Sequence, residues 1–312
     1  TELAAETLEA FLGTYDIGAL VSFQGIAEGV ENSNFLLQTT EGKFILTLFE
    51  RRVKASDLPW FLVLMQHLSG KGMNCPQPVQ AKDGIALRVL ADRPAAITTF
   101  LPGQAVPQIT KSACHALGQV LATFHKLGQD YTAERPNGLS VEAWRPLLES
   151  CQGSGDDLLP GLTQELSEAL SRIEKSWPAV GSLPRGQIHA DLFPDNVFFQ
   201  GDQVSGLIDF YFACTDLFAY DLAICLNAWC FRDEKVFEPA FAHAMIEGYE
   251  SVRNLEVAEK EALPVLCQGA SIRFLLTRLY DWINTPADAL VTRKDPLAYL
   301  GRLRHFSGVA HV

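Results

Sequence analysis

A proline- and glycine-rich stretch, LPGQAVPQ at residues 101–108, divides this sequence into two parts of different character. Before it, β-branched and apolar stretches bounded by turn residues predict a small antiparallel sheet, with one helix that begins at Ser56 or Asp57. After it, apolar residues recur at helical spacing from Thr110 to Gly128, and most of the chain beyond Gly128 is also helical in pattern. We therefore expect an α+β fold, with a small β-rich N-terminal part, residues 1–103 with a hinge at the end, and a larger helical part, residues 104–312.

The expected elements are set by the turn signals between them. Strands are predicted at 19–25, 34–40 and 43–50, with a turn at Glu41-Gly42, and a second hairpin is predicted around 91–94. In the helical part, helices are expected over 217–231 and 236–249 among others, and the only strands expected are those around residues 187–209.

The negative net charge argues against some kinds of binding partner. There are 25 Lys and Arg against 37 Asp and Glu, a formal charge of −12, and an acidic surface repels nucleic acids and anionic membranes. Apolar runs such as 45–49 and 61–65 are far shorter than the ~20 residues that span a bilayer. We expect a cytoplasmic protein without a nucleic-acid, membrane or obligate protein partner. The 7 cysteines include no Cys-x-x-Cys pair, which favours buried, reduced thiols over zinc sites or disulfides.

The sequence HADLFPDN, residues 189–196, concentrates polar groups between two predicted strands. A hairpin formed by 196–200 and 204–209 is expected to bring Asp209 back alongside Asn196. A carboxylate and an amide oxygen are hard ligands of the kind Mg²⁺ prefers, and Asp191 adds an acceptor for a hydroxyl proton. The spacing His-x-Asp-x-x-x-x-Asn has the logic of a phosphoryl-transfer loop, with Asp191 as the base and Asn196 and Asp209 as metal ligands.

Two other interpretations of this motif remain open. Asp195-Asn196 could be an ordinary polar turn with Asp191 as a loop cap. A metal hydrolase could use His189 with Asp191, although the spacing offers no second ligating histidine. Because His189 ends an apolar strand, we expect it to order the loop by hydrogen bonding and not to act in catalysis.

The motif and its continuation, GLIDFYFACTDLFAYDLA at 206–223, resemble the aminoglycoside phosphotransferase and choline kinase superfamily, whose fold is that of protein kinases. More narrowly, segments 29–50, 100–103, 117–128 and 269–282 are similar to those of bacterial homoserine kinases in that superfamily. The resemblance implies a two-lobed protein-kinase-like fold with a nucleotide-binding N-terminal lobe. It also implies phosphorylation of the L-homoserine hydroxyl, a step toward threonine, with ATP and Mg²⁺.

The resemblance also implies roles for individual residues. It assigns Asp191 as catalytic base, Asn196 and Asp209 as Mg²⁺ ligands, and Asp221 as a brace of the catalytic loop, with Asp216 in the same following segment. The residues that would contact ATP are Gly25, Gly29, Asn32, Ser33 and Asn34 in a turn over the phosphates, and the backbone of Thr98 to Leu101, including Phe100 and Leu101, at the hinge.

One position departs from the kinase pattern. The third strand usually carries a basic residue for the α- and β-phosphates, and here Thr47 stands about where it should be. The predicted helix 56–70 also lacks an internal glutamate, so the usual ion pair cannot form from these positions. The basic residues nearby are Lys43, Arg51, Arg52 and Lys54, which either reach the phosphates or form a solvated face. Weak nucleotide binding, or an inactive nucleotide-binding protein, is the remaining interpretation.

The substrate pocket is less well indicated. Homoserine requires a cation for its carboxylate, and Arg273 and Arg278 on an apolar helix are candidates, with ion pairing to Asp281 or Glu261 as the alternative. A kinase for choline, ethanolamine or an amino sugar is an open alternative. Choline-type substrates require an aromatic cage for the quaternary cation, and this sequence offers aromatic residues for one. The aromatic residues close enough in sequence to form one are Tyr211, Trp229 and Phe231.

Overall fold

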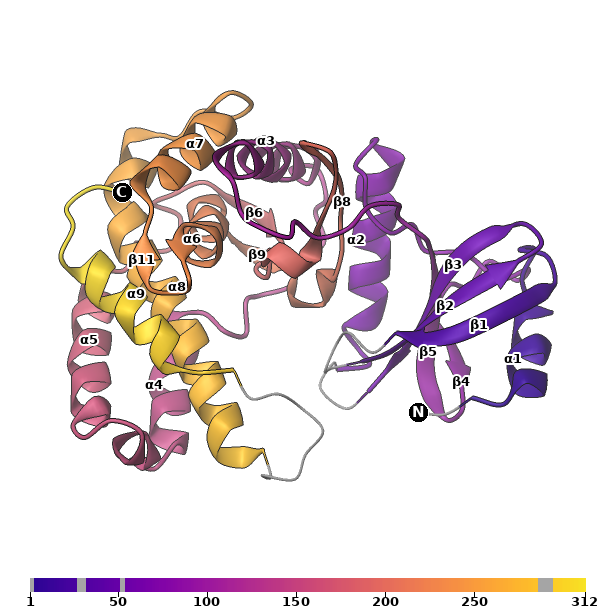
Figure 1. The fold of residues 1–312 in the computed structure, drawn as a ribbon, viewed down its shortest axis with the longest axis horizontal. Helices are drawn as coiled ribbons and strands as arrows, with labels where there is room; N and C mark the ends of the chain where they lie inside the picture. The colour runs from indigo at the N-terminus through magenta and orange to yellow at the C-terminus, as the bar shows by residue number, and fades with distance from the viewer. Residues whose placement is uncertain (1–2, 27–31, 51–53, 286–293) are drawn as a thin grey trace. The chain divides into compact units, whose positions relative to one another are not determined.

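The computed structural model describes residues 3–26, 32–50, 54–285 and 294–312. The chain forms two compact units (Figure 1). Unit 1 comprises Thr1–Gln104, Phe198–Gln200 and Ser205–Tyr211, and unit 2 comprises Ala105–Val197, Gly201–Val204 and Phe212–Val312. The boundary expected between residues 103 and 104 falls one residue before the first of these divisions, and the hairpin after residue 196 contributes to both units.

Unit 1 is an antiparallel sheet with two helices. Its strands are β1 (Leu20–Ile26), β2 (Asn32–Thr39), β3 (Gly42–Phe49), β4 (Arg88–Leu90) and β5 (Arg93–Thr99), in the order β1-β2-β3-β5-β4, with α1 (Ala5–Leu12) and α2 (Leu58–Gly70). Leu8 of α1 packs with Leu37, Leu46 and Ile97 of the sheet in one core cluster. The turns are tight, and Ala91 and Asp92 between β4 and β5 both have positive φ, at 51° and 58°, as a two-residue hairpin requires. Both predicted hairpins are therefore present.

Unit 2 is mainly helical. Its helices are α3 (Lys111–Leu127), α4 (Val141–Ser150), α5 (Leu162–Ser176), α6 (Phe218–Trp229), α7 (Pro239–Glu250), α8 (Val257–Asn284) and α9 (Leu297–Ser307), with short 3₁₀ turns at Ser154–Asp157, Pro194–Asn196 and Phe210–Phe212, the last of which begins in unit 1. Every residue of α6 is buried, and apolar side chains surround the helix except at Asp221 and Asn227. The α+β prediction is confirmed by the sheet of unit 1 and the helices of unit 2.

Two glycines let α3 and α7 approach closely, and the helices lie side by side in Figure 1. A Cβ atom on Gly118 would lie 2.1 Å from the carbonyl oxygen of Met245, and one on Gly248 would lie 2.1 Å from that of His115. Real Cβ atoms do not come so near a backbone oxygen. Each helix therefore leaves a gap for the other, and the contact fixes α3 against α7.

The strands after residue 184 differ in part from expectation. The described pairs are β6 (Arg185–Ile188) with β9 (Cys214–Leu217), β7 (Val197–Gln200) with β8 (Gln203–Leu207), and β10 (Phe231–Arg232) with β11 (Val236–Phe237). The expectation that 187–209 contains the only strands of this half is wrong, because β9, β10 and β11 lie outside it. The helix expected to begin at 236 begins at Pro239 instead, since Val236 pairs with Arg232 across a turn in which Asp233 and Glu234 have positive φ.

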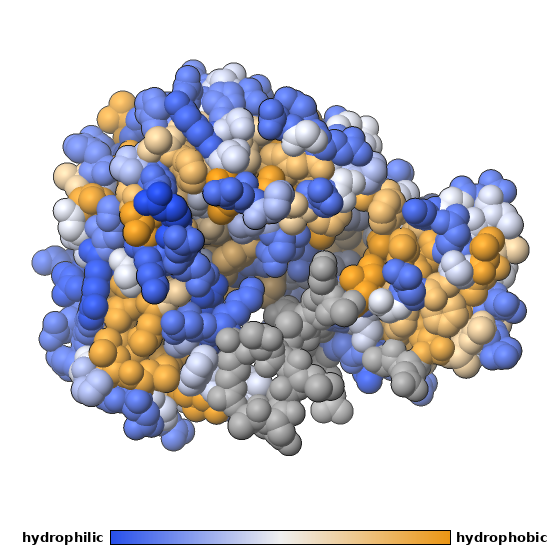
Figure 2. All heavy atoms as spheres, in the orientation of Figure 1, coloured by the Kyte–Doolittle hydropathy of each residue, from blue (hydrophilic) through white to orange (hydrophobic). Residues whose placement is uncertain are grey.

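Much of the surface drawn in Figure 2 is hydrophilic, and the cysteines are buried as expected from the sequence. On the face drawn in Figure 2, hydrophilic residues cover much of unit 2, with smaller hydrophobic patches between them. Within the described ranges, no helix is long and apolar enough to cross a membrane. All seven cysteines are buried free thiols.

Candidate active site

The loop that follows β6 is held through its backbone by three side chains from two helices, α6 and α8. At the start of α6, Asp221 accepts hydrogen bonds from the backbone nitrogens of His189 and Ala190, each at 2.8 Å. From α8, Arg273 donates to the carbonyl oxygen of Ala190 at 2.5 Å. The indole of Trp229 donates to the carbonyl oxygen of Leu192 at 2.8 Å. Ala190 has φ of 63°, a strained conformation for a residue with a Cβ, and these contacts hold it there.

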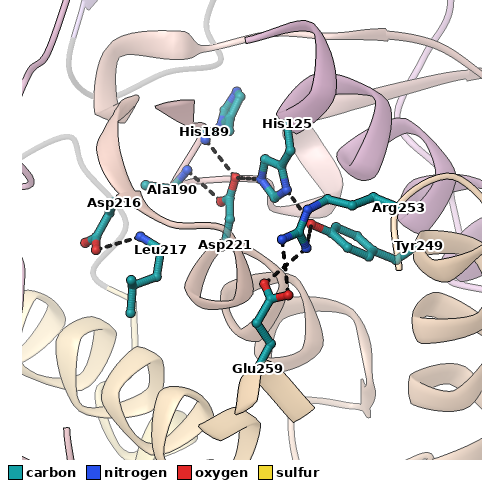
Figure 3. Close-up of polar contacts among 9 residues, drawn as sticks. All are labelled: His125, His189, Ala190, Asp216, Leu217, Asp221, Tyr249, Arg253 and Glu259. Carbon is teal, nitrogen blue, oxygen red and sulfur yellow. Dashed lines mark hydrogen bonds and ion pairs between the residues drawn. The ribbon is translucent and has the colours of Figure 1, made fainter. Parts of the chain in front are cut away.

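Behind this loop lies a chain of buried polar contacts (Figure 3). Nε2 of His125 lies 3.0 Å from Oδ2 of Asp221, and Nδ1 of His125 lies 2.7 Å from the hydroxyl of Tyr249. Arg253 donates to that hydroxyl at 3.1 Å and forms a two-bond pair with Glu259, at 3.1 Å each. Each contact can be given one donor if His125 is neutral. Arg253 donates to the hydroxyl of Tyr249, this hydroxyl donates to Nδ1 of His125, and the Nε2–H group of His125 donates to Asp221.

The environment of this chain shifts the pKa of its members. Burial lowers the pKa of His125, although the neighbouring Asp221 carboxylate acts in the opposite direction. Burial alone would raise the pKa of Asp221, but hydrogen bonds from His125 and from the backbone of His189, together with the electrostatic effect of these two imidazoles, lower it overall. Asp221 is therefore an ionised, fully buried carboxylate whose oxygens are turned to the loop and to His125.

Asp191 and Asn196 are brought together in unit 2. The amide nitrogen of Asn196 donates to the carbonyl oxygen of Asp191 at 2.8 Å and lies 3.3 Å from its Oδ2 atom. Because the nitrogen of the amide is turned to Asp191, its oxygen is turned away from that residue. Asn196 is buried, whereas Asp191 is half-buried and so accessible to a substrate. The motif predicts this proximity, and the roles of Asp191 as base and Asn196 as metal ligand stay predictions.

Asp209 belongs to unit 1 and is described there. The strand predicted to continue through it ends at Leu207, and Asp209 has φ of 61°, so its backbone is strained like that of Ala190. The expected approach of Asp209 to Asn196 joins two separately described units and stays a prediction.

The polar residues at the start of β2 bond mainly to the end of β3. The hydroxyl of Thr47 donates to the side-chain oxygen of Asn34 at 2.9 Å, and the hydroxyl of Ser33 donates to Glu50 at 3.0 Å. The side-chain oxygen of Asn32 accepts from the backbone nitrogen of Glu50 at 3.3 Å. These three predicted phosphate-contacting residues thus share one end of the sheet. Gly25 lies in β1 opposite Phe35, and Gly29 lies outside the described residues.

Thr47, which stands where a lysine was expected, has a structural role. It is buried, and besides Asn34 it makes a side-chain hydrogen bond with Tyr211. Burial raises the pKa of Tyr211, the charge of Asp209 raises it further, and the bond with Thr47 opposes both. The ring of Tyr211 packs edge-on against Phe49 at 5.0 Å. Thr47 thus ties β2 and β3 to the segment that carries Asp209.

The nearby cations lie in different places. Lys43 lies over the ring of Phe100 at 5.6 Å, at the opposite end of β3 from Glu50. Arg51 and Arg52 are outside the described residues, and Lys54 is exposed. Sequence reasoning missed Arg93, which forms an ion pair with Glu50 at 3.0 Å, at the end of the sheet that carries Asn32 to Asn34. No sequence signal placed Arg93 beside Glu50, because their proximity depends on the register of β5 with β3.

The predicted hinge residues contact β3 and β8 within unit 1. Phe100 is partly exposed, and its backbone nitrogen lies 3.4 Å from the carbonyl oxygen of Lys43. The side chain of Leu101 packs on Gly206, where a Cβ atom would lie 2.8 Å from it. Ser205 donates to the carbonyl oxygen of Pro102 at 2.8 Å. These contacts position the segment expected to meet adenine.

Arg273 and Arg278 do not use the partners Asp281 and Glu261 considered from the sequence. Arg273 is buried and contacts Ala190, whereas Arg278 donates to the carbonyl oxygen of Asp295 at 3.1 Å and lies 4.0 Å from Glu234. The residues considered for an aromatic cage are engaged in other contacts, and Trp229 and Phe231 are buried. Trp229 holds the loop, Phe231 packs against Phe237 at 5.3 Å, and Tyr211 packs in unit 1.

Sequence reasoning also missed the buried chain behind the loop. Its members are His125, Tyr249, Arg253 and Glu259. One signal was available, because His125 follows Phe124 within the apolar pattern of α3, where a polar residue requires a buried partner. Asp216, which the resemblance placed in this region, accepts from Asn137 at 2.7 Å. It also accepts from the backbone nitrogen of Leu217 at 2.8 Å, the contact drawn in Figure 3.

Comparison with known proteins gives the family. Residues 22–255 match the model of the Phosphotransferase enzyme family. A homoserine kinase of Gluconobacter oxydans (strain 621H) is 74% identical over 312 residues, which is 100% of this chain and 99% of the relative. A homoserine kinase of Gluconacetobacter diazotrophicus is 61% identical over 304 residues, 97% of this chain and 95% of that protein.

A solved structure agrees on the fold. The amicoumacin kinase in complex with AMP-PNP, Ca²⁺ and Ami superposes with a TM-score of 0.70 over 97% of this chain and 92% of that one, at 15% sequence identity. At that identity, the likeness concerns the fold alone. It agrees with the kinase-like fold that the resemblance implied.

Proposed function

The chain belongs to the Phosphotransferase enzyme family, and from this premise we propose that it transfers the γ-phosphoryl group of ATP to the side-chain hydroxyl of L-homoserine. The products are ADP and O-phospho-L-homoserine. The observation that carries the choice of substrate is 74% identity to a homoserine kinase over the whole chain. The observation that supports the type of reaction is the pairing of Asp191 with Asn196 on a loop fixed from behind by Asp221.

Asp191 is the group that handles the substrate proton. Its carboxylate orients the hydroxyl and accepts the proton as the new oxygen–phosphorus bond forms and the bond to the leaving ADP oxygen breaks. The proton then passes from Asp191 to solvent. Holding the carboxylate still is the contribution of Asn196 and of the braced loop, because misplacement of a reacting group costs rate steeply.

Mg²⁺ fits the donor set of these residues. Asn196 turns its amide oxygen away from Asp191, and Asp209 supplies a carboxylate, so both offer the hard oxygen ligands that this ion takes. When bound with ATP, Mg²⁺ would be held by Asn196 and Asp209 and would neutralise charge on the phosphate oxygens.

The direct test is ADP release on a panel of hydroxyl substrates that includes L-homoserine, choline, ethanolamine and an amino sugar. We expect release that depends on L-homoserine and that is abolished in Asp191→Asn, with circular dichroism unchanged. Release only with another member of the panel would replace homoserine with that substrate. ADP binding without release on any substrate would instead favour an inactive nucleotide-binding protein.

A further inference from the structure

A pocket of about 360 Å³ opens on unit 2 beside the catalytic loop. Four segments line it. Phe193 and Asp195 come from the loop, Glu234 from the turn between β10 and β11, Arg278 from α8, and Lys294 and Asp295 from the residues before α9. Its size suits a small metabolite, and its walls carry charges of both signs. None of the roles assigned so far in phosphoryl transfer uses this pocket.

Arg278 is the best placed cation in the pocket. Its side chain is only 10% exposed, so most of the guanidinium is removed from water. Its one described hydrogen bond runs from Nη1 to the carbonyl oxygen of Asp295, and Glu234 is 4.0 Å away. A guanidinium has five N–H donors in a fork that matches a carboxylate. Arg278 therefore keeps donors for an anion that enters the pocket.

Tyr299 relates this cation to the catalytic base. The guanidinium carbons of Arg278 and Arg302 lie 4.6 Å and 4.3 Å from the centre of its ring. Its buried hydroxyl has no hydrogen-bond partner in the described part of the chain. Burial raises the pKa of Tyr299 to about 12, the two arginines oppose the rise, and the Asp191 carboxylate adds to it. Arg278 therefore packs on Tyr299, and the pocket that it lines also includes Phe193 and Asp195 of the loop that carries Asp191.

The anions of the pocket suit a cationic group on the same ligand. Asp195 makes no described hydrogen bond or ion pair, whereas Asp295 uses its side chain to cap α9 through the backbone nitrogen of Leu297 at 2.8 Å. Asp195 is therefore the carboxylate that remains for an ammonium. A ligand with a carboxylate and an ammonium meets both requirements, whereas choline or an amino sugar leaves Arg278 without an anion.

We propose that this pocket binds the α-amino-acid end of the substrate, with Arg278 on the α-carboxylate and Asp195 accepting from the α-ammonium. The assignment rests on the proposed function, because it takes an amino acid with a hydroxyl as the substrate. The pocket then selects amino acids that carry a side-chain hydroxyl. The side chain of the amino acid then extends from the pocket toward Asp191.

The test combines variants with truncated substrates. L-Homoserine is compared with 3-amino-1-propanol, which lacks the carboxylate, and with 4-hydroxybutyrate, which lacks the ammonium. We expect Arg278→Gln to lower kcat/KM for L-homoserine by on the order of 100-fold, mainly through KM, and to change kcat/KM for 3-amino-1-propanol by less than about 3-fold. Asp195→Asn should show the same selectivity with 4-hydroxybutyrate as the insensitive substrate.

Two further variants separate a substrate contact from loss of structure. Arg278→Lys keeps the positive charge but loses the forked pair of N–H donors. We expect kcat/KM for L-homoserine to fall by about 10-fold, a value between those of wild type and Arg278→Gln. Arg304→Gln is the matched control, because Arg304 lies on α9 and pairs with Glu165 on the exposed surface. Arg304→Gln should leave kcat/KM unchanged for all three substrates.

The outcomes distinguish the two proposals. If the wild type releases ADP with L-homoserine but Arg278→Gln loses activity equally on L-homoserine and 3-amino-1-propanol, the pocket assignment is overturned and the function stands. If the wild type releases no ADP with L-homoserine, the proposed function fails and the assignment fails with it.

Discussion

The Oδ2 atom of Asp221 lies 3.0 Å from Nε2 of His125, and both side chains are completely buried. The same carboxylate accepts from the backbone of the loop that carries Asp191. The protonation of one histidine on α3 is therefore linked to the geometry of the reacting loop.

The first prediction concerns stability against pH. In the folded protein the pKa of His125 lies below its usual value of 6.5. As the pH falls below about 6.5, the unfolded chain therefore binds a proton at this histidine that the folded chain does not bind, and the free energy of unfolding decreases. The pKa of Asp221 is also lowered, from 3.8, so its contribution is lost at still lower pH. Unfolding free energies from urea titrations should therefore decrease on acidification, by at most about 1.4 kcal/mol per pH unit for each proton.

His125→Gln isolates the histidine in this experiment. Glutamine keeps a nitrogen donor for Asp221 and does not titrate, so the slope between pH 6.5 and 5 should decrease relative to wild type. An unchanged slope in this variant would assign the pH dependence to another group, such as His305, whose pKa is also lowered by burial.

The second prediction separates the two ends of the buried chain. Asp221→Asn places an N–H donor beside the backbone nitrogens of His189 and Ala190, so we expect kcat to fall by on the order of 100-fold. Glu259→Gln breaks the pair with Arg253 but leaves the loop contacts in place. It should lose about 2–4 kcal/mol of stability while kcat at 20 °C stays within about 3-fold. Equal effects on kcat in both variants would contradict a specific role for Asp221.

The third prediction concerns the metal. Asp209→Ala should abolish turnover with Mg·ATP while the melting temperature in the absence of nucleotide changes little, because the expected role of Asp209 is to hold the ion. Steady-state assays over a range of Mg²⁺ concentrations check this, with Asp202→Ala as the control on the exposed turn between β7 and β8. Near-normal turnover in Asp209→Ala would remove it from the metal site.

The fourth prediction concerns Thr47. Thr47→Val removes the donor to Asn34 and the bond with Tyr211 inside a buried site, which should cost about 1–3 kcal/mol. In a double-mutant cycle with Tyr211→Phe, the two losses should not add, with a coupling of about 1 kcal/mol. Additive losses, measured by chemical denaturation, would mean that the two hydroxyls do not depend on one another.

The fifth prediction concerns the missing lysine. Since Arg93 pairs with Glu50 at the end of the sheet that carries Asn32 to Asn34, we expect it to supply positive charge for the ATP phosphates. Arg93→Gln should raise KM for ATP by about 10-fold and leave KM for L-homoserine unchanged. Arg88→Gln is the matched control, because Arg88 pairs with Asp83 elsewhere on unit 1. No difference between the two variants would exclude Arg93 from nucleotide binding.

The fold could be predicted from local patterns, and the site only in part. Turn residues and apolar spacing identified the sheet of unit 1, and the spacing of Asp191 and Asn196 identified the loop. The resemblance alone assigned Asp221 as a brace of the loop. The contacts of His125 and Arg273 could not be predicted, because these residues lie far from the loop in sequence and reach it only after α3, α6 and α8 pack. Likewise Arg93 and Glu50 become neighbours only through the register of β3 with β5.

The close contact of α3 with α7 bears on how a deep mutational scan of this protein should be read. Gly118 and Gly248 will score among the least tolerant positions, since even alanine meets a backbone oxygen at 2.1 Å. Their scores will match those of Asp191, although the reason is space and not chemistry. Measuring the abundance of each variant alongside growth would separate the two groups, because the glycine variants should be depleted as proteins while Asp191 variants accumulate without activity.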